Sequence, residues 1–466
     1  FVVVSDVERH TDTTALAHVL LPSAAWGEKD GTVTNSERRI SRQRAFLNAP
    51  GGARPDWWQI AEVAKRMGFD GFNWQSPAEI FVEHAALTGS DNNGTRDLDL
   101  SALAAITADA YDALAPFQWP HPAGGTPRDA RFFSDGRFFT PDRRARFVPT
   151  AYVQPNAAAQ HLRLNTGRIR DQWHTMTRTA KSARLTAHIA EPFVEINVAD
   201  AAHAGLAAAG LARVSNAHGQ AILRVLVTDR VPPGQLFAPM HWSDQFASAA
   251  RINALVSANA DPISGQPALK CSPVEIAPYD ARWYAFAAGI ERPVLDGLGY
   301  WALARRNSGW SAEIANEVPL ISPRELLRRL WPMCARHDLI ALHDQATGTS
   351  RFAMFEGDRL AAALFISPNP VAAARTFITA QIGNTFTSAA ERYRVLAGRA
   401  GASMSDPGPT VCACFEVGRN VIVDAVRGGC HSVEAVGTLT RAGTNCGSCR
   451  VEIGALIDVQ CRAHAG

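Results

Sequence analysis

Six of the eight cysteines of this 466-residue chain fall within its last 55 residues. Cys412 and Cys414 form a C-x-C pair, Cys446 and Cys449 form a C-x-x-C pair, and 31 residues lie between the two pairs. Each short spacing places two sulfurs at one edge of a site, so the two pairs together can bind one tetrahedral metal ion or a 2Fe-2S cluster. Spacing alone leaves zinc and iron–sulfur open.

Disulfide bonds are the other use for these thiols. The chain opens Phe-Val-Val-Val-Ser-Asp, which lacks an initiator Met and the basic, apolar and small-residue layout of a secretory signal. Because reducing compartments keep thiols free for metals, we favour a metal site and a cytoplasmic location. Cys430 and Cys461 lie outside the pattern and are expected to pack in the core. Since the opening residues resemble an interior strand, we also expect the chain to be a piece of a longer or processed polypeptide.

Composition excludes several classes of protein. Hydrophobic residues make up 47% of the chain and charged residues 19%, values that exclude collagen-like, disordered and small disulfide-rich proteins. The net charge of +2 gives no reason to expect nucleic acid or an anionic membrane as a partner. No apolar stretch reaches the roughly 18 residues that a membrane-spanning helix needs. The length allows about three domains of roughly 150 residues each.

Hydrophobic patterning divides the chain into four regions. Residues 1–125 have an α/β pattern, in which Trp57, Ile60, Ala61 and Ala64 share one face of a helix predicted near residues 56–67 and are expected to pack in the core. Residues 121–150 are rich in Pro, Gly and Arg and predict an irregular connection that ends this region near residue 150. Residues 155–280 alternate with the period of strands and predict a β-barrel or sandwich. Residues 281–402 form a mixed α/β region, with a helix capped by Ser322 and a hairpin over residues 351–366. The cysteine-rich module occupies residues 410–461.

The cysteine-rich module resembles a known iron–sulfur family. Its pattern Cys412-x-Cys414, followed by Ala442-Gly-Thr-x-Cys446-Gly-x-Cys449, resembles the bacterioferritin-associated-ferredoxin-like (BFD-like) 2Fe-2S module. The resemblance implies a 2Fe-2S cluster held by these four cysteines, with zinc as the alternative. The glycines beside Cys446 can expose backbone N–H groups toward sulfur.

A second resemblance covers roughly residues 1–280. The run Leu164-Asn-Thr-Gly-Arg168, followed by Asp171-Gln-Trp-His-Thr175, is similar to the opening of the molybdopterin-dinucleotide-binding domain of molybdopterin oxidoreductases. The segment at residues 21–31 is similar to the end of the preceding catalytic domain of these enzymes. The pair His241-Trp242, Asn253 and residues 261–270 resemble the later part of the dinucleotide-binding domain. This resemblance implies that residues 1–150 end a catalytic domain, that residues 155–280 form a double-psi-type β-barrel, and that the cofactor is Mo-bis(molybdopterin guanine dinucleotide).

The dinucleotide needs particular residue types. Pyrophosphates and polar ring edges require Gly for close approach, Arg or Lys for charge, and Thr, Asn or His as hydrogen-bond donors. Taken singly, each such residue more often belongs to a turn or a solvated surface, so only their joint order favours the cofactor. The candidate cofactor-binding residues are Thr166, Gly167, Arg168, His174, Thr175, Asn253 and Lys270.

A molybdopterin domain joined to a C-terminal 2Fe-2S module resembles the bacterial assimilatory nitrate reductases. The resemblance implies reduction of nitrate to nitrite at molybdenum, with electrons entering through the 2Fe-2S cluster from an NADH-dependent flavoprotein reductase, a ferredoxin or a flavodoxin. In that family a 4Fe-4S motif and the protein ligand to molybdenum lie upstream, whereas no cysteine precedes Cys271 here. The catalytic residues are therefore expected outside this chain, which should not be active alone.

Two other functions stay open at this point. A formate dehydrogenase or another molybdopterin reductase can share the same cofactor-binding domain, because a fold does not fix a substrate. A truncated product could instead serve only as an iron–sulfur electron-transfer module.

Overall fold

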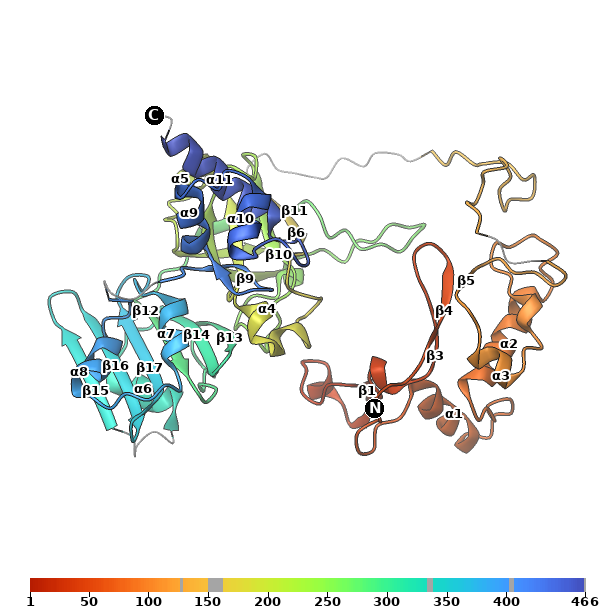
Figure 1. Cartoon of the computed structure of the whole chain (residues 1–466), viewed down its shortest axis with the longest axis horizontal. Coiled ribbons are helices and arrows are strands. Elements are labelled where there is room, and N and C mark those ends of the chain that lie inside the picture. The colour runs from red at the N-terminus through yellow and green to blue at the C-terminus, as the bar shows by residue number, and fades with distance from the viewer. Residues whose placement is uncertain (126–128, 150–161, 333–337, 402–405, 465–466) are drawn as a thin grey trace. The chain divides into compact units, whose positions relative to one another are not determined.

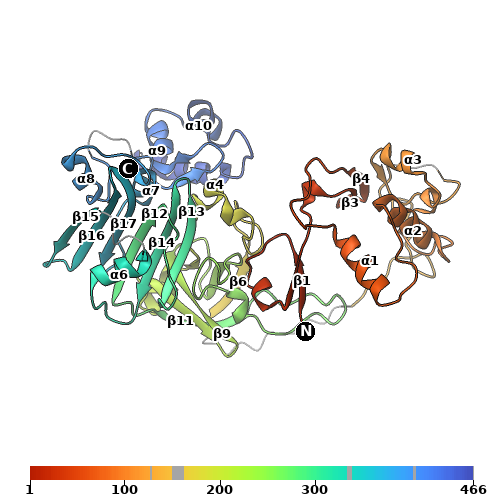
Figure 2. The ribbon, with the colours of Figure 1, turned by 90° about the horizontal axis from the view of Figure 1, so that it is seen from below.

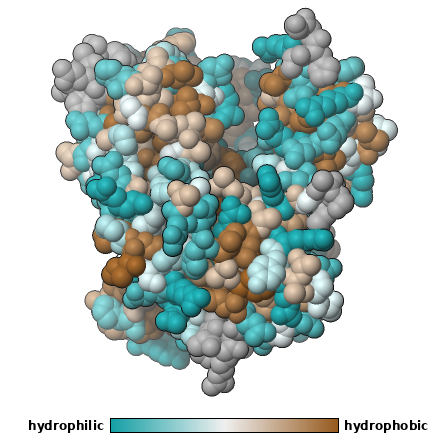
Figure 3. Space-filling model, turned by 90° about the vertical axis from the view of Figure 1, so that its left-hand side faces the viewer, coloured by the Kyte–Doolittle hydropathy of each residue, from teal (hydrophilic) through white to brown (hydrophobic). Residues whose placement is uncertain are grey.

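A computed structural model describes residues 1–125, 129–149, 162–332, 338–401 and 406–464 (Figure 1). The chain divides into two compact units, Phe1–Pro155 and Asn156–Gly466. Among the described helices, none has both the length and the hydropathy of a membrane span. Polar and apolar residues are interspersed on the face of the molecule displayed in Figure 3.

The described residues of the first unit form short strands and the helices α1, α2 and α3 around a small core. A parallel pair joins β1 to β2, and an antiparallel sheet has the order β3-β4-β5. The core packs Phe81 and Tyr111 against Ile40. The elements are β1 (Val3–Asp6), β2 (Val19–Pro22), β3 (Gly31–Thr34), β4 (Arg39–Gln43), α1 (Asp56–Arg66), α2 (Pro77–Gly89), α3 (Ala108–Asp112) and β5 (Phe117–Gln118).

The helix expected near residues 56–67 is present as α1, but part of its expected apolar face is not buried. Ala61 and Ala64 are 1% and 7% exposed, whereas Ile60 is 62% exposed. Gln59 takes a buried place instead, where its side-chain amide donates hydrogen bonds to the carbonyls of Pro22 and Arg54. The expectation that Ile60 packs in the core is therefore wrong within this unit. The buried face of α1 includes Gln59, because the carbonyls of Pro22 and Arg54 beside the helix need a hydrogen-bond donor.

The second unit begins with a closed six-stranded barrel in the order β10-β6-β11-β8-β9-β7, which confirms the expected barrel. The β6–β10 and β7–β9 pairs are parallel, and the other neighbours are antiparallel. Short helical segments α4 (Ala183–Thr186), α5 (Val198–His203) and η5 (Ile252–Leu255) connect the strands. The strands are β6 (Leu162–Gly167), β7 (Phe193–Ile196), β8 (Leu211–Asn216), β9 (Gly219–Val227), β10 (Gln235–Pro239) and β11 (Ser272–Pro278).

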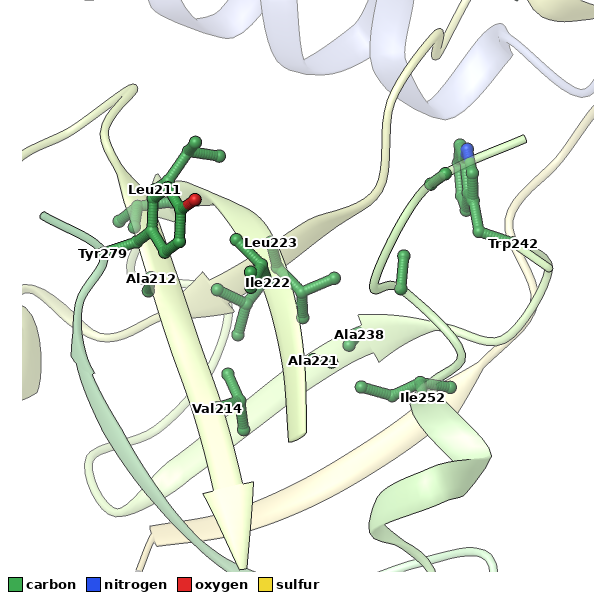
Figure 4. Close-up of a cluster of buried hydrophobic side chains, with 14 of the residues drawn as sticks. Leu211, Ala212, Val214, Ala221, Ile222, Leu223, Ala238, Trp242, Ile252 and Tyr279 are labelled. Carbon is green, nitrogen blue, oxygen red and sulfur yellow. The ribbon is translucent and has the colours of Figure 1, made fainter. Parts of the chain in front are cut away.

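Alternate residues of the barrel strands fill its interior. Figure 4 shows Val214 of β8 and Ala221 of β9, which are register partners, within one apolar cluster, to which Ala238 of β10 also belongs. Trp242 and Ile252, which follow β10 along the chain, belong to the same cluster and are 3% and 1% exposed. The loops after β10 are thus anchored by apolar burial to the core that closes the barrel.

A six-stranded antiparallel sheet follows, in the order β13-β14-β12-β17-β16-β15. The expected hairpin is the β16–β17 pair, and the expected cap is present, since the Ser322 hydroxyl accepts from the Glu325 N–H at 3.4 Å. The elements are β12 (Trp283–Gly289), β13 (Tyr300–Arg306), β14 (Gly309–Asn316), α6 (Pro323–Leu330), β15 (Asp338–Asp344), β16 (Thr349–Glu356), β17 (Arg359–Ser367), α7 (Arg375–Gln381) and α8 (Ala389–Val395).

Helices cover both faces of this sheet (Figure 2). Leu330 of α6 packs in one apolar cluster with Met354, and Ile378 of α7 packs in the other with Phe286 and Phe355. Because both faces are buried, β12 and β17 are apolar almost throughout instead of alternating.

A buried ionic network joins the barrel to the sheet. Arg224 of β9 lies 3.0 Å from the Glu191 carboxylate, which also accepts from the Tyr300 hydroxyl of β13 at 2.8 Å. Glu313 of β14 pairs with Arg375 of α7 at 2.9 Å and lies 3.9 Å from Arg224. Burial raises the pKa of Glu191, although Arg224 opposes that shift. The network holds β9 against the sheet, because removing one charge would leave its partner buried without a counter-charge.

Removal of Arg224 tests this network. Arg224→Met should lower the free energy of unfolding by about 3 kcal/mol, because it leaves the Glu191 carboxylate buried without its cation. Arg213→Met is the matched control on β8, since its partner Glu317 is 45% exposed and the loss should stay within about 1 kcal/mol. Urea unfolding followed by tryptophan fluorescence measures both variants. Equal losses in the two would contradict a structural role for the buried network.

Candidate functional site

The end of β6 and the loop that follows it contain five of the seven candidate cofactor-binding residues. Thr166 is 3% exposed, and its hydroxyl donates to the Leu269 carbonyl at 2.9 Å. The Lys270 ammonium donates to the Thr166 carbonyl. A Cβ at Gly167 would lie 2.5 Å from the Phe237 ring, so glycine leaves room for that ring in its present position. The structure therefore brings Thr166, Gly167 and Lys270 together.

Arg168, His174 and Thr175 lie exposed on the same loop. The Arg168 guanidinium is 5.3 Å from the centre of the Trp173 ring, and that ring meets the His174 imidazole edge-on at 4.6 Å. His174 adopts a φ of 44°, in the left-handed region. These side chains present a cation and hydrogen-bonding groups to the solvent around the loop, which suits an anionic, polar ligand.

A buried histidine absent from the predicted site holds this loop. His241 is fully buried, its Nε2 accepts from the Ile169 N–H at 3.0 Å, and its Nδ1 lies 2.7 Å from the His174 carbonyl. This geometry requires Nδ1 to carry the proton and the ring to be neutral. Burial lowers the pKa of His241, and the hydrogen bond to the His174 carbonyl opposes that shift. His241 thus ties the loop at two points, Ile169 and His174, to the segment that follows β10.

The remaining candidate, Asn253, is separate from the candidates on β6 and the loop after it. Asn253 is exposed on η5, between the buried residues Ile252 and Leu255. Within the described ranges, no side-chain hydrogen bond joins Asn253 or Thr175 to Thr166, Gly167 or Lys270. The sequence signal for His241 was the pair His241-Trp242 in the resemblance to the dinucleotide-binding domain, but only burial and hydrogen bonding show what the residue does.

The four paired cysteines come from two loops of the small module. β18 (Thr410–Cys412) and β19 (Val417–Gly418) flank the first loop, and the second lies between α10 (Val433–Thr440) and α11 (Arg450–His464), after α9 (Arg419–Arg427). The Cys414 and Cys446 sulfurs are 3.4 Å apart. Cys412 and Cys449 are both 2% exposed. Burial, followed by the adjacent Cys412 thiol, raises the pKa of Cys449 to about 11.

The sulfurs therefore form two pairs, each with one cysteine from each loop. In the described part of the chain, no three His, Cys, Asp or Glu side chains are grouped to hold one metal ion. A structural zinc needs four donors around a single ion, whereas a 2Fe-2S cluster takes two thiolates on each of two irons. Two pairs of thiols match the donor arrangement that a 2Fe-2S cluster takes.

The other two cysteines of the module pack at the edge of its apolar core. Cys430 and Cys461 are partly buried against the cluster of residues around Ile422 and Ile453. The Cys461 sulfur lies 3.6 Å from Nδ1 of His431. Their contacts match the packing role expected from the sequence.

Acidification should loosen the loop that His241 holds. Because its pKa is lowered in the folded protein, the contribution of His241 to stability is complete above about pH 6.5 and is lost as the pH falls through the folded pKa. Amides of residues 169–176, corrected for intrinsic exchange, should be more protected at about pH 7.5 than at about pH 5.5. His241→Phe should abolish that difference, and His218→Phe, at an exposed turn, should preserve it. Equal protection at both pH values in the unaltered protein would refute the role.

Three regions of the chain match known families. Residues 1–66 match the molybdopterin oxidoreductase family, residues 162–273 match the molydopterin dinucleotide binding domain, and residues 410–458 match the BFD-like 2Fe-2S binding domain. These matches support a molybdopterin dinucleotide and a 2Fe-2S cluster as the cofactors.

Curated relatives agree with these matches. A nitrate reductase from Klebsiella oxytoca is 40% identical over 461 residues, which are 98% of this chain and 52% of that protein. A nitrate reductase from Shewanella frigidimarina is 42% identical over 66% of this chain and 35% of its own length. A putative formate dehydrogenase from Bacillus subtilis is 33% identical over 59% of this chain and 26% of its own length. The chain spans about half or less of the length of these relatives. It resembles bacterial nitrate reductases over almost its whole length and combines a molybdopterin-dinucleotide-type barrel with a BFD-like 2Fe-2S module.

Proposed function

We propose that this chain forms the dinucleotide-binding and electron-entry part of a molybdopterin-dependent nitrate reductase that works in nitrate assimilation. The observation that carries the proposal is the 40% identity to a nitrate reductase over 98% of the chain, including the region of the cysteine module. The reaction consumes nitrate, two electrons and two protons, and yields nitrite and water. Bound molybdopterin would supply the oxygen-atom transfer, and the residues of this chain would bind and orient it.

The barrel loop would hold the dinucleotide. Thr166, Gly167 and Lys270 lie together at the end of β6, where glycine permits close approach and lysine supplies a positive charge. Arg168, His174 and Thr175 would add the exposed donors of the loop, and Asn253 would act from η5. His241 would act indirectly, because it fixes the loop and is itself fully buried.

Electrons would enter through a 2Fe-2S cluster on Cys412, Cys414, Cys446 and Cys449. The supporting feature is the pairing of sulfurs across the two loops. The donor would be a cytoplasmic flavoprotein reductase, a ferredoxin or a flavodoxin. A 4Fe-4S cluster and the protein ligand to molybdenum would belong to a part of the parent protein outside these residues.

A formate dehydrogenase is the second candidate. A putative formate dehydrogenase matches 59% of this chain, so the shared cofactor-binding region alone does not choose the substrate. The longer match to the nitrate reductase favours nitrate.

The ligand set predicts opposite results for two cysteines of one module. Cys446→Ser should abolish the visible absorption and the paramagnetic signal of a reduced 2Fe-2S cluster, because one iron loses a thiolate. Cys430→Ser is the matched control and should retain both signals and about two irons per chain. Metal analysis after anaerobic preparation distinguishes this result from one bound zinc. A full iron–sulfur signal in Cys446→Ser would overturn the ligand assignment.

The activity itself is tested on the intact protein purified from its host under anaerobic conditions. With a reduced dye as donor it should form nitrite from nitrate, and it should not oxidise formate. A protein that holds molybdenum and iron but converts only formate would favour the second candidate. Iron without molybdenum, and no turnover of either compound, would instead indicate an electron-transfer module.

A further inference from the structure

A cluster of four charged side chains joins the barrel loop to the cysteine module. Arg170 donates to the Glu452 carboxylate at 2.5 Å, and the same guanidinium nitrogen lies 2.8 Å from Nε2 of His188. His188 Nε2 is 3.3 Å from Glu452, and its Nδ1 is 3.1 Å from Asp171. Arg170 also lies 3.4 Å from Asp171. We call these four residues the Glu452 junction.

The Glu452 junction joins a segment of the proposed barrel site to a segment that follows the proposed cluster site. Arg170 and Asp171 belong to the same loop as Arg168 and His174, and Glu452 is in the first turn of α11, three residues after Cys449. The helices of the module lie beside the barrel (Figure 1), and the ion pair between Arg170 and Glu452 joins the two. A short, rigid helical turn thus connects one cysteine to the barrel contact.

The junction is largely shielded from solvent. The side chains of Arg170, Asp171 and His188 are 17%, 10% and 12% exposed, and that of Glu452 is 42% exposed. Charges in such a place are strongly coupled, and the loss of one leaves its partners poorly solvated. Burial lowers the pKa of His188, but hydrogen bonds to Asp171 and Glu452 outweigh it and raise the pKa overall.

The charges of the junction lie beside the turn that follows Cys449. Arg170 contacts Glu452, which lies three residues after Cys449 in the first turn of α11, and Asp171 lies 3.4 Å from Arg170. A nearby cation stabilises a more negative redox centre, and a nearby anion destabilises it. Neutralising the two residues should therefore shift a cluster potential in opposite directions.

We propose that the Glu452 junction positions the cysteine module against the dinucleotide-binding loop for electron transfer, and that Arg170 and Asp171 tune the cluster from that contact. Reduction of one nitrate takes two electrons, so a 2Fe-2S cluster held by these four cysteines would have to pass two electrons, one at a time, from the donor protein toward molybdenum. The proposal rests on the proposed function for its redox part. Its structural part, the attachment of α11 to the barrel loop, stands without it.

Glu452→Gln tests the attachment, with Glu434→Gln as the matched control. Glu434 pairs with Arg450 on the same module, but its side chain is 70% exposed, so both variants remove one negative charge and only one breaks a shielded contact. Glu452→Gln in the intact protein should speed hydrogen exchange roughly tenfold in the first turn of α11 and in residues 168–176. Nitrate turnover should fall by a similar factor, with the KM for nitrate unchanged. Glu434→Gln should change neither.

Redox titration followed by electron paramagnetic resonance tests the tuning. Arg170→Gln should make the cluster potential more negative, and Asp171→Asn should make it more positive, because the two changes remove opposite charges. A purely structural contact would shift the potential in the same direction in both variants or in neither, and that result would overturn the redox role. Exchange in Glu452→Gln equal to that in Glu434→Gln would overturn the attachment. A protein without any iron–sulfur signal would refute the proposed function, while the exchange experiment would still decide the attachment.

Discussion

The parallel pairing of β6 with β10 is the constraint from which the candidate site follows. It sets Gly167 beside Pro239, so that the chain leaves both strands at the same end of the barrel. Because Gly167 has no side chain, the Phe237 ring can lie against its backbone. The two chains that leave this end are then tied together by His241, which bonds to the backbone at Ile169 and His174. A neutral, fully satisfied imidazole can be buried there at little cost, whereas a charged one cannot.

The loop after β6 presents some of its residues to solvent and others to the cysteine module. Its exposed residues, Arg168 and His174, offer a cation and a polar ring to solvent, while Arg170 and Asp171 are partly buried against the cysteine module. A loop held rigidly at one end can thus serve a cofactor site and a domain contact together. The buried Arg224–Glu191 pair acts similarly between the barrel and the sheet, where shielding from water makes each charge dependent on its partner.

Local sequence predicted the elements better than it predicted their neighbours. The Ser322 cap, the β16–β17 hairpin and the barrel strands follow from capping chemistry, turns and period-two alternation, which act over a few residues. The buried face of α1 was predicted less well, because the 3.6-residue period of a helix does not show which backbone carbonyls of other segments lie beside it. Gln59 is buried to satisfy two of them, and Ile60 is exposed.

By itself the sequence determined the types and order of the site residues: glycine and lysine at the ends of the barrel segments, and two cysteine pairs in the module. These depend on side-chain chemistry and short spacing, which the chain carries locally. Only the tertiary structure decided that the sulfurs pair across loops, that His241 holds the barrel loop, and that Arg170 meets Glu452, 282 residues away. Such contacts arise when separate elements bury their surfaces together, and no local pattern specifies which distant charges or thiols then become neighbours.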